Sequence, residues 1–202
     1  MSIILEGFPI QYIMKDQLAD FFRKEFPFHQ EGLEEFMASF EVKYYKKKSL
    51  LLSAGQKVQE LCFLNKGVVR EYYQSDKKES NINFYDGPQF VTDFSAFNRD
   101  IPTFKFQECL TEIEVRVMAK NTFRKLLEKY ECGGVIVQRT FERLLAEKEK
   151  SMYRRLTKTP EELYQQIAAE KANWLQKIPQ YHIASYLGVT PETLSRIRGK
   201  IR

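Results

Sequence analysis

The stretch QYHIASYLGVTPETLSRIRGKI, residues 180–201, constrains the fold of this chain more than any other part of it. Its spacing predicts a short helix up to about Tyr186 and a second helix from Pro191, with Gly188 turning the chain sharply between them and Thr190 capping the second helix. The pattern Ala-x3-Gly-x5-Leu-x2-Ile matches the helix-turn-helix, which places its second helix in the major groove of DNA. The apolar residues expected to hold the two helices together are Ile183, Ala184, Leu187, Leu194, Ile197 and Ile201.

A purely structural helical hairpin would fit the same spacing, so the surface of the second helix and the charge decide between the two interpretations. Residues 1–150 carry 23 Lys or Arg against 23 Asp or Glu, whereas residues 151–202 carry 9 against 4 and so hold the whole net charge of +5. A basic terminal module on a neutral body indicates nucleic-acid binding. A hairpin would not need the polar side chains on and beside the outward face of the second helix, which are Ser195, Arg196, Arg198, Lys200 and Arg202.

The composition limits the class of protein. A chain of 202 residues with 43% hydrophobic and 29% charged residues is typical of a globular protein with one large or two small domains. No apolar run approaches the ~20 residues that span a membrane, and the N-terminus lacks the pattern of a secretory signal, so we expect a cytoplasmic protein without membrane contact. The three cysteines are too far apart for a clustered metal site and favour reduced thiols. They are Cys62, Cys109 and Cys132.

A change of pattern near Glu41 predicts a β-rich middle of the chain. Before it, residues 15–40 have helical spacing that is interrupted at Pro27. After it, short runs rich in β-branched and aromatic residues alternate with turn signals up to about residue 119, which suggests a sandwich or barrel. The three predicted hairpin turns are Asn65-Lys66-Gly67, Ser75-Asp76-Lys77-Lys78 and Asp86-Gly87-Pro88.

A helix of about 22 residues, roughly 33 Å long, is predicted over residues 135–156. It can pack on its own sheet, or it can form a seam with the same helix of a second copy. A DNA-binding module with two-fold symmetry beside it favours the seam, and hence a homodimer. The apolar stripe of this helix, interrupted near Lys148, is formed by Val137, Phe141, Leu144, Leu145 and Met152 and continues to Leu156.

Thr159-Pro160-Glu161-Glu162 predicts the start of the next helix, because it combines a capping residue, a first-turn proline and first-turn acids. We therefore expect three parts. An effector domain covers residues 1–130, a dimerisation helix covers 131–157, and a DNA-binding domain covers 158–202.

Two stretches, IPQYHIASYLGVTPETLSRIRGKI and QFVTDFSAF, resemble the Crp/Fnr family of bacterial transcription regulators, in a subgroup common in Bacteroidetes. The resemblance covers the whole chain. It implies an α+β fold: an N-terminal antiparallel β-roll, or double-stranded β-helix, of the cyclic-nucleotide-binding type with flanking helices, then a long dimerisation helix and an all-helical C-terminal helix-turn-helix domain. It also implies a sequence-specific regulator that binds a palindromic DNA operator as a homodimer, with RNA polymerase as a further candidate partner.

The resemblance implies roles for residues of the C-terminal module. Glu192 and Arg196 occupy the base-reading positions of the recognition helix, where a carboxylate can accept from cytosine and Arg can fork onto guanine. Pro191 stands where the family often has Arg, so the operator sequence of this chain cannot be inferred from the operators of relatives. No β-hairpin wing is evident after the recognition helix, and both a natural absence and a shortened chain fit this. The expected phosphate contacts are Gln180, Tyr181, His182, Thr193, Ser195, Arg198 and Lys200.

The same alignment disfavours cyclic AMP as an effector. Family members that bind it hold the phosphate and ribose with a Gly-Glu pair and a downstream Arg-Ser or Arg-Thr. Here Thr92-Asp93 and Pro102-Thr103 stand in those places, so the guanidinium that pairs with phosphate is missing. An empty or repurposed pocket is expected instead. For Arg70 and the aromatic residues, a surface arginine of a strand and ordinary core aromatics are favoured over a place in the lining of that pocket. The candidate lining residues are Arg70, Phe84, Tyr85, Phe90, Thr92, Asp93, Phe94, Arg99 and Thr103.

Other classes of function fit the sequence less well. A ligand-sensing β-roll that binds a small molecule or a protein partner without binding DNA leaves the basic C-terminal surplus unexplained. The chain has two histidines, His29 and His182, too far apart for a cupin metal site, and no N-terminal cysteine cluster for oxygen sensing. It also has no glycine-rich phosphate loop and no triad-like motif, so we expect no enzyme and no metal, and no cofactor other than the disfavoured cyclic nucleotide.

Overall fold

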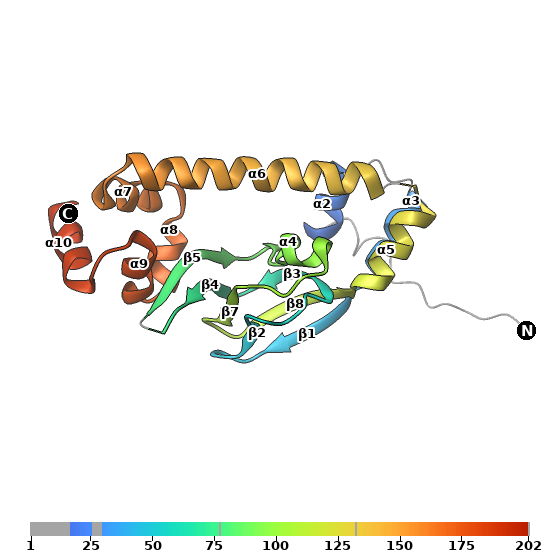
Figure 1. The fold of residues 1–202 in the computed structure, drawn as a ribbon, viewed down its shortest axis with the longest axis horizontal. Coiled ribbons are helices and arrows are strands. Elements are labelled where there is room, and N and C mark those ends of the chain that lie inside the picture. Colours follow the sequence, from blue (N-terminus) through green and yellow to red (C-terminus); the bar gives the residue numbers. More distant parts are fainter. Residues whose placement is uncertain (1–16, 26–29, 77, 132, 202) are drawn as a thin grey trace, which may run out of the picture.

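The computed structural model describes residues 17–25, 30–76, 78–131 and 133–201, which form a β-roll, one long helix and a C-terminal group of four helices (Figure 1). His29, Cys132 and Arg202 lie outside the described residues. The strands are β1 (Glu41–Tyr45), β2 (Leu50–Leu52), β3 (Glu60–Lys66), β4 (Val68–Gln74), β5 (Glu79–Asp86), β6 (Gln89–Phe90), β7 (Phe106–Cys109) and β8 (Ile113–Ala119). The helices are α2 (Gln17–Glu25), α3 (Gln30–Ala38), α4 (Phe94–Arg99), α5 (Lys120–Lys129), α6 (Gly133–Thr157), α7 (Pro160–Glu170), α8 (Ala172–Lys177), α9 (Gln180–Leu187) and α10 (Pro191–Ile201).

The strands form two four-stranded antiparallel sheets, in the orders β1-β8-β3-β6 and β2-β7-β4-β5. Alternate side chains of each strand point into the roll, as the two-residue period of a strand requires. The α+β fold with an antiparallel roll, expected from the sequence, is confirmed. The apolar interior between the sheets consists of Cys62, Leu64, Val69, Val91, Cys109, Ile113, Val115 and Val117.

Two of the three predicted hairpin turns are instead crossings between sheets. Gly67 separates β3 from β4, and Gly87 separates β5 from β6, yet the strands on either side of each glycine belong to different sheets. Gly67 has a φ of 104°, which lies in the region that favours glycine. Turn composition marks a change of direction without saying whether the next strand pairs with the last. The prediction is right between β4 and β5, where Gln74 pairs with Glu79.

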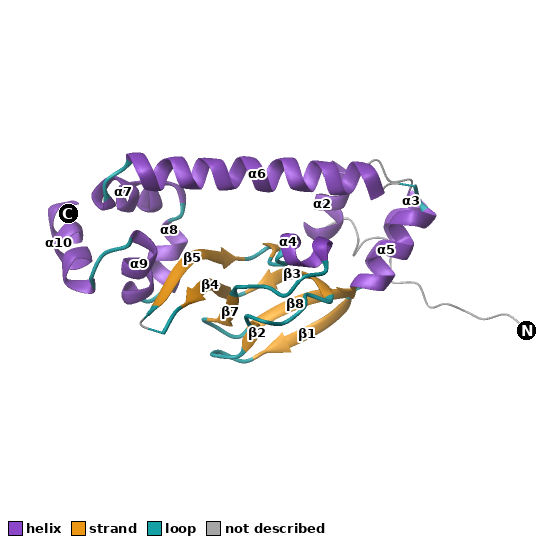
Figure 2. Cartoon of the chain, in the orientation of Figure 1, coloured by secondary structure: helices purple, strands orange, loops and turns teal. Residues whose placement is uncertain are grey.

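The N-terminal helices and α5 lie at one end of the roll (Figure 2). A cluster of buried aromatic residues fills the contact between them. Phe36 packs against both Phe22 and Phe123, with ring centroids 5.6 and 6.1 Å apart. Phe90 of β6 joins the cluster through Phe22 and Phe63. This cluster ties the roll to the start of α6, where Ile136 is buried.

Helix α6 is 25 residues long and runs from the N-terminal helices to the C-terminal group (Figure 1). Ile136 is its one fully buried side chain among the described residues. The predicted stripe is largely uncovered, because Phe141 is 40% exposed, Leu145 61% and Met152 60%. Packing against the chain's own sheet therefore does not account for this stripe. None of the described helices is both long and apolar enough to cross a membrane.

The C-terminal helices pack around a core that includes residues of the roll. Thr159 caps α7 through a capping box with Glu162, as its sequence predicts. Trp174 of α8 lies against Phe84 of β5, with ring centroids 5.1 Å apart. The buried members of this core are Val68, Phe84, Leu110, Tyr164, Ile167, Trp174, Ile178, Ile183, Ala184, Leu187, Leu194 and Ile197.

Replacing Gly67 by alanine is expected to lower the free energy of unfolding by at least about 2 kcal/mol. The added Cβ would lie 2.6 Å from the Glu112 carbonyl oxygen and 2.7 Å from Ile113 Cγ2, in addition to the cost of the positive φ. Gly55→Ala is the matched control, because Gly55 has a φ of 85° but no atom within 4 Å of the added Cβ. Urea unfolding of both variants measures the difference; equal destabilisation would contradict the crowding at Gly67.

Candidate nucleic-acid interface

Helices α9 and α10 are two short helices joined by a turn, at the positions that the sequence predicts. Gly188 ends α9 in a left-handed conformation, with a φ of 72°, and Val189 N–H donates to the Ala184 carbonyl at 3.0 Å. Ile183, Ala184, Leu187, Leu194 and Ile197 are buried between and beneath the two helices. Ile201 is 38% exposed, so its predicted place in this core is wrong. It lies in the last turn of α10, beyond the reach of α9.

The first turn of α10 carries an ordered set of side chains on an open face. Thr193 N–H donates to the Thr190 hydroxyl at 3.3 Å, which confirms the predicted cap. The Arg196 guanidinium donates to the Thr193 hydroxyl at 3.2 Å. Hydrogen bonds from its own backbone amide and from Thr190 lower the pKa of Glu192, so this carboxylate is charged at neutral pH. Glu192 and Arg196 are both exposed, side by side on one face.

The predicted phosphate contacts have different surroundings. Tyr181 is 59% exposed, and Ser195 and Lys200 are exposed as well. Lys200 forms an ion pair with Glu161 of α7 at 3.1 Å, so contact with a phosphate would compete with this pair. Gln180 is half-buried, with its amide directed at the Leu175 carbonyl.

His182 does not lie on the open face, so its predicted contact with phosphate is wrong for this arrangement. Its side chain is 7% exposed and packs against β5. The Asn81 amide lies 3.2 Å from His182 Nδ1 and donates to the His182 carbonyl at 3.2 Å. Burial, together with the nearby charge of Arg70, lowers the pKa of His182 to about 4. The ring is therefore neutral at pH 7, with Nδ1 free to accept from Asn81.

The outer face of β4 and β5 holds the C-terminal module through further contacts. Ser185 accepts a hydrogen bond from Asn81 N–H at 3.1 Å and lies 3.4 Å from the Glu79 carbonyl. The Tyr186 ring packs on Phe84, with ring centroids 5.6 Å apart. Lys177 of α8 pairs with Asp86 at 2.8 Å. Asn81 carries no signal of this role in the sequence, because its partners lie about one hundred residues away along the chain.

Arg70 and Phe84 lie on this outer face, so the structure does not bring them together with the other predicted pocket residues. Arg70 is 5% exposed and donates to both Glu108 and Glu79 at 2.6 Å. The next residue, Glu71, points into the roll, as the alternation of a strand requires. The alternative of a surface arginine is also wrong, because these acidic partners allow Arg70 to be buried.

Inside the roll, a polar cluster lies where the sequence places the effector pocket. The Thr103 hydroxyl donates to Asp93 at 2.7 Å, and the Lys105 ammonium lies 3.4 Å from both Asp93 and Glu71. Glu71 accepts hydrogen bonds from the Gln107 amide at 2.9 Å and from the Tyr85 hydroxyl at 3.0 Å. Burial lowers the pKa of Lys105, but the two carboxylates raise it by more, so this ammonium is charged at neutral pH.

Glu71, Lys105 and Gln107 were not among the predicted pocket residues. The alternation in FKFQEC places Lys105, Gln107 and Cys109 on one face, a signal that could have identified two of them. Of the predicted residues, Thr92 bonds to the backbone of Cys62, and Phe90 and Phe94 belong to the aromatic cluster at the end of the roll. Arg99 is exposed on α4.

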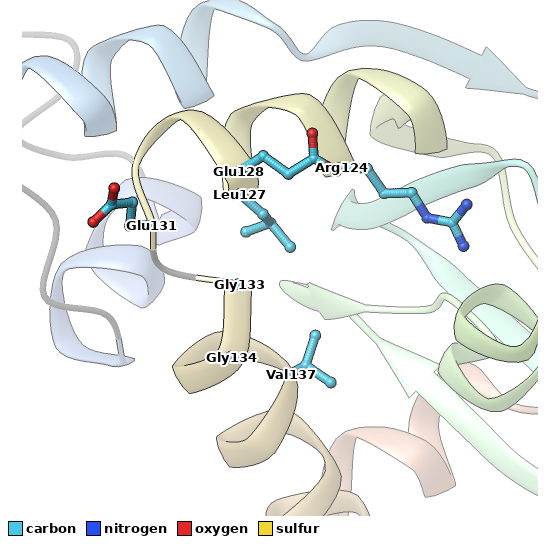
Figure 3. A pocket seen from close by; sticks show the side chains of 7 residues that line it. All are labelled: Arg124, Leu127, Glu128, Glu131, Gly133, Gly134 and Val137. Carbon is cyan, nitrogen blue, oxygen red and sulfur yellow. The ribbon is translucent and has the colours of Figure 1, made fainter.

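The described cysteines are the free, buried thiols of Cys62 and Cys109, and burial raises their pKa values to about 12 and about 11. Within the described ranges, no three His, Cys, Asp or Glu side chains are grouped to hold a metal ion. A hollow of about 460 Å³ lies at the corner between α5 and α6, where Leu127 and Val137 point into the space between the helices (Figure 3).

Lowering the pH from 7 to 5 is expected to decrease the free energy of unfolding of the wild type by roughly 2 kcal/mol more than that of His182→Gln. The pKa of His182 is lower in the folded chain than the ordinary value of 6.5, so the unfolded chain takes up the proton first. The stabilisation is therefore present above about pH 6.5 and is lost as the pH falls toward 4. Chemical denaturation at both pH values measures it; parallel behaviour of the two proteins would contradict the buried, neutral His182.

Comparison with known proteins agrees with this geometry. Residues 42–130 match the family model described as the cyclic nucleotide-binding domain. The c-di-GMP-responsive global regulator CLP of Xanthomonas campestris is similar in structure, with a TM-score of 0.63 and 14% identity over 86% of this chain and 91% of that one. FixK2 of Bradyrhizobium japonicum gives a TM-score of 0.63 and 17% identity over 80% and 84% of the two chains. The catabolite activator protein of Thermus thermophilus gives a TM-score of 0.54 and 13% identity over 87% of this chain and 84% of that one.

No curated protein matches the chain in sequence. At these low identities the similarity to solved structures establishes the fold. The chain thus has a region, residues 42–130, that matches the cyclic nucleotide-binding domain family, within the fold shared by these three proteins.

Proposed function

We propose that this chain is a transcription regulator of the Crp/Fnr family, in the subgroup common in Bacteroidetes, and that it binds DNA in the cytoplasm as a homodimer. The observation that carries this proposal is the open face of α10. Glu192 and Arg196 are exposed in its first turns, while the apolar side of the helix is buried against α9. A helix presented in this way can enter the major groove with its N-terminal turns against base edges.

The side chains of this face suggest how bases are read. Arg196 can donate two hydrogen bonds to O6 and N7 of guanine, and Glu192 can accept from N4 of cytosine. Thr193 holds the Arg196 guanidinium in the absence of DNA, so less side-chain freedom is lost when the base contact forms. Tyr181, Ser195, Arg198 and Lys200 border the same face and would contact phosphates, which fix position and supply the salt dependence.

The exposed stripe of α6 supports a homodimer. Phe141, Leu145 and Met152 recur at helical spacing and have no cover in the single chain. Pairing two copies of α6 along this stripe would bury it, and the hollow beside Val137 would continue the same surface at one end. Two copies related by a two-fold axis present two recognition helices, which suits a palindromic operator. A regulator bound in this way at a promoter can also contact RNA polymerase.

The polar cluster in the roll argues against cyclic AMP as the effector. A cyclic phosphate would meet the carboxylates of Asp93 and Glu71, and the partly buried ammonium of Lys105 already lies 3.4 Å from both of them. No arginine of the described interior is available to form a bidentate pair, because Arg70 faces the other side of the sheet. We therefore propose a roll that does not take a cyclic nucleotide in the usual way.

Arg196→Ala is expected to weaken binding to the preferred duplex by about 10- to 100-fold and to relax selectivity at one base pair. Lys200→Ala is expected to reduce the slope of log affinity against log salt by about 1, with little change in selectivity. Fluorescence anisotropy with a selected duplex and a scrambled one measures both effects.

Lys125→Ala serves as the control for these variants, since Lys125 is exposed on α5, outside the C-terminal module. Normal selective binding by Arg196→Ala would refute its assignment as a base reader. If the wild type failed to bind DNA even at low salt, the proposed function would fail, and a ligand-sensing role without DNA would be favoured.

Leu145→Glu is expected to raise the dissociation constant of the dimer by about tenfold or more, because it places a charge in a buried apolar seam. Ala146→Glu is the matched control, since Ala146 is also exposed and lies about 100° around the helix from Leu145. Sedimentation equilibrium measures both constants, and equal effects of the two substitutions would exclude this stripe as the dimer seam.

A further inference from the structure

A β-bulge in β5 places Asn81 against the DNA-binding module. Glu71 of β4 pairs with Asn83, but its neighbour Tyr72 pairs with Asn81, so Ile82 is an extra residue in β5. In a regular strand Asn81 and Asn83 would share a face. The bulge reverses this relation: Asn83 bonds to Tyr85 inside the roll, whereas Asn81 turns outward to His182 and Ser185 of α9.

Asn81 uses both its side chain and its backbone in this contact. Its amide reaches the ring nitrogen and the carbonyl of His182, and its N–H donates to Ser185. Asn81 itself is 2% exposed, so these groups would be left without partners in a dry interface if α9 were shifted slightly. The contact is therefore specific for one orientation of α9, whereas the neighbouring aromatic rings would stay in contact over a range of orientations.

The covalent connection between α6 and the C-terminal helices is short. Only Lys158 and Thr159 separate the end of α6 from the start of α7. The bulge supplies a second link between these parts, because the carbonyl of the extra residue, Ile82, accepts a hydrogen bond from Arg155 in the last turn of α6 at 3.2 Å. One short segment of β5 thus contacts both the proposed dimerisation helix and the DNA-binding module.

The docked position leaves the DNA-reading face free. Asn81 contacts the side of α9 that carries His182 and Ser185, while Tyr181 of α9 and Arg196 of α10 remain exposed. Docking is therefore compatible with DNA binding. What it restricts is the direction in which each recognition helix points from the dimer, and hence the separation of two half-sites that both helices can reach.

We propose that Asn81 is a positioning residue that makes the dimer selective for the spacing of its two half-sites. The inference rests on the proposed function, since it requires a homodimer that binds DNA. Asn81 touches no DNA itself; it acts through α9. A rigidly held pair of recognition helices fits one spacing, whereas a loosely held pair accommodates several, each at a greater cost in orientational freedom.

The test compares three duplexes: one with two half-sites at the preferred spacing, one with the spacing increased by half a helical turn, about 5 base pairs, and one with a single half-site. Wild type is expected to prefer the first duplex over the second by about tenfold or more, and Asn81→Ala to reduce this ratio to about threefold or less. Affinity for the single half-site is expected to stay the same, because the reading face is intact.

Two further variants distinguish loss of this contact from a general loss of structure. Ser185→Ala removes the other side of the same contact and is expected to shift the ratio in the same direction. Asn173→Ala removes an exposed amide of α8 in the same module and should leave the ratio unchanged. Hydrogen exchange without DNA provides an independent measurement, in which the amides of α9 exchange faster in Asn81→Ala than in wild type.

The outcomes separate this inference from the function on which it rests. If wild type binds the preferred spacing selectively and both Asn81→Ala and Ser185→Ala keep the wild-type ratio, the positioning role is refuted while DNA binding stands. If wild type binds none of the duplexes, the proposed function fails and this inference fails with it. Loss of single half-site binding in Asn81→Ala would also refute the positioning role, since it would show damage to the reading face.

Discussion

The packing of α9 and α8 on the outer face of β5 is the contact on which the arrangement of the molecule depends. Two residues connect α6 to the C-terminal helices, and the contacts with β5 hold these helices on the roll. Burial of Phe84 against Trp174 and Tyr186 contributes an apolar term of roughly 2 kcal/mol. The polar groups of Asn81, His182 and Ser185 then favour one orientation, because the Asn81 amide and backbone N–H reach α9 only in this position.

Strands β4 and β5 have different chemistry on their two faces. Toward the roll interior they present Glu71 and Tyr85, which join the cluster around Lys105; toward the C-terminal module they present Arg70, Asn81 and Phe84. A change of charge inside the roll would therefore act on the strands that hold α9. Lys105 neutralises part of the negative charge in that interior through its ion pairs with Glu71 and Asp93.

Local features of the sequence predict many of the helices, strands and caps of this structure. They do not predict contacts between residues that are far apart along the chain. The turn between α9 and α10 follows from Gly188 and Thr190, whose roles depend on neighbouring residues. The chain crosses between the sheets at Gly67, where the sequence predicts a hairpin, because a turn signal does not specify whether the strands on its two sides pair with each other. His182 and Arg70 were misplaced for the same reason: their burial depends on Asn81, Glu79 and Glu108, which the fold brings in from other strands.

A homodimeric regulator that needs no cyclic nucleotide can be tested by selecting bound sequences from random duplex DNA with the full chain, with and without cyclic AMP. We expect enrichment of a palindrome whose half-sites lie about one helical turn apart, about 10 to 10.5 base pairs, with the same sequence and yield in both arms. Enrichment of sequences without two-fold symmetry, or no enrichment at all, would contradict a homodimeric regulator. Enrichment only in the presence of cyclic AMP would contradict the proposal that the roll interior does not take a cyclic nucleotide.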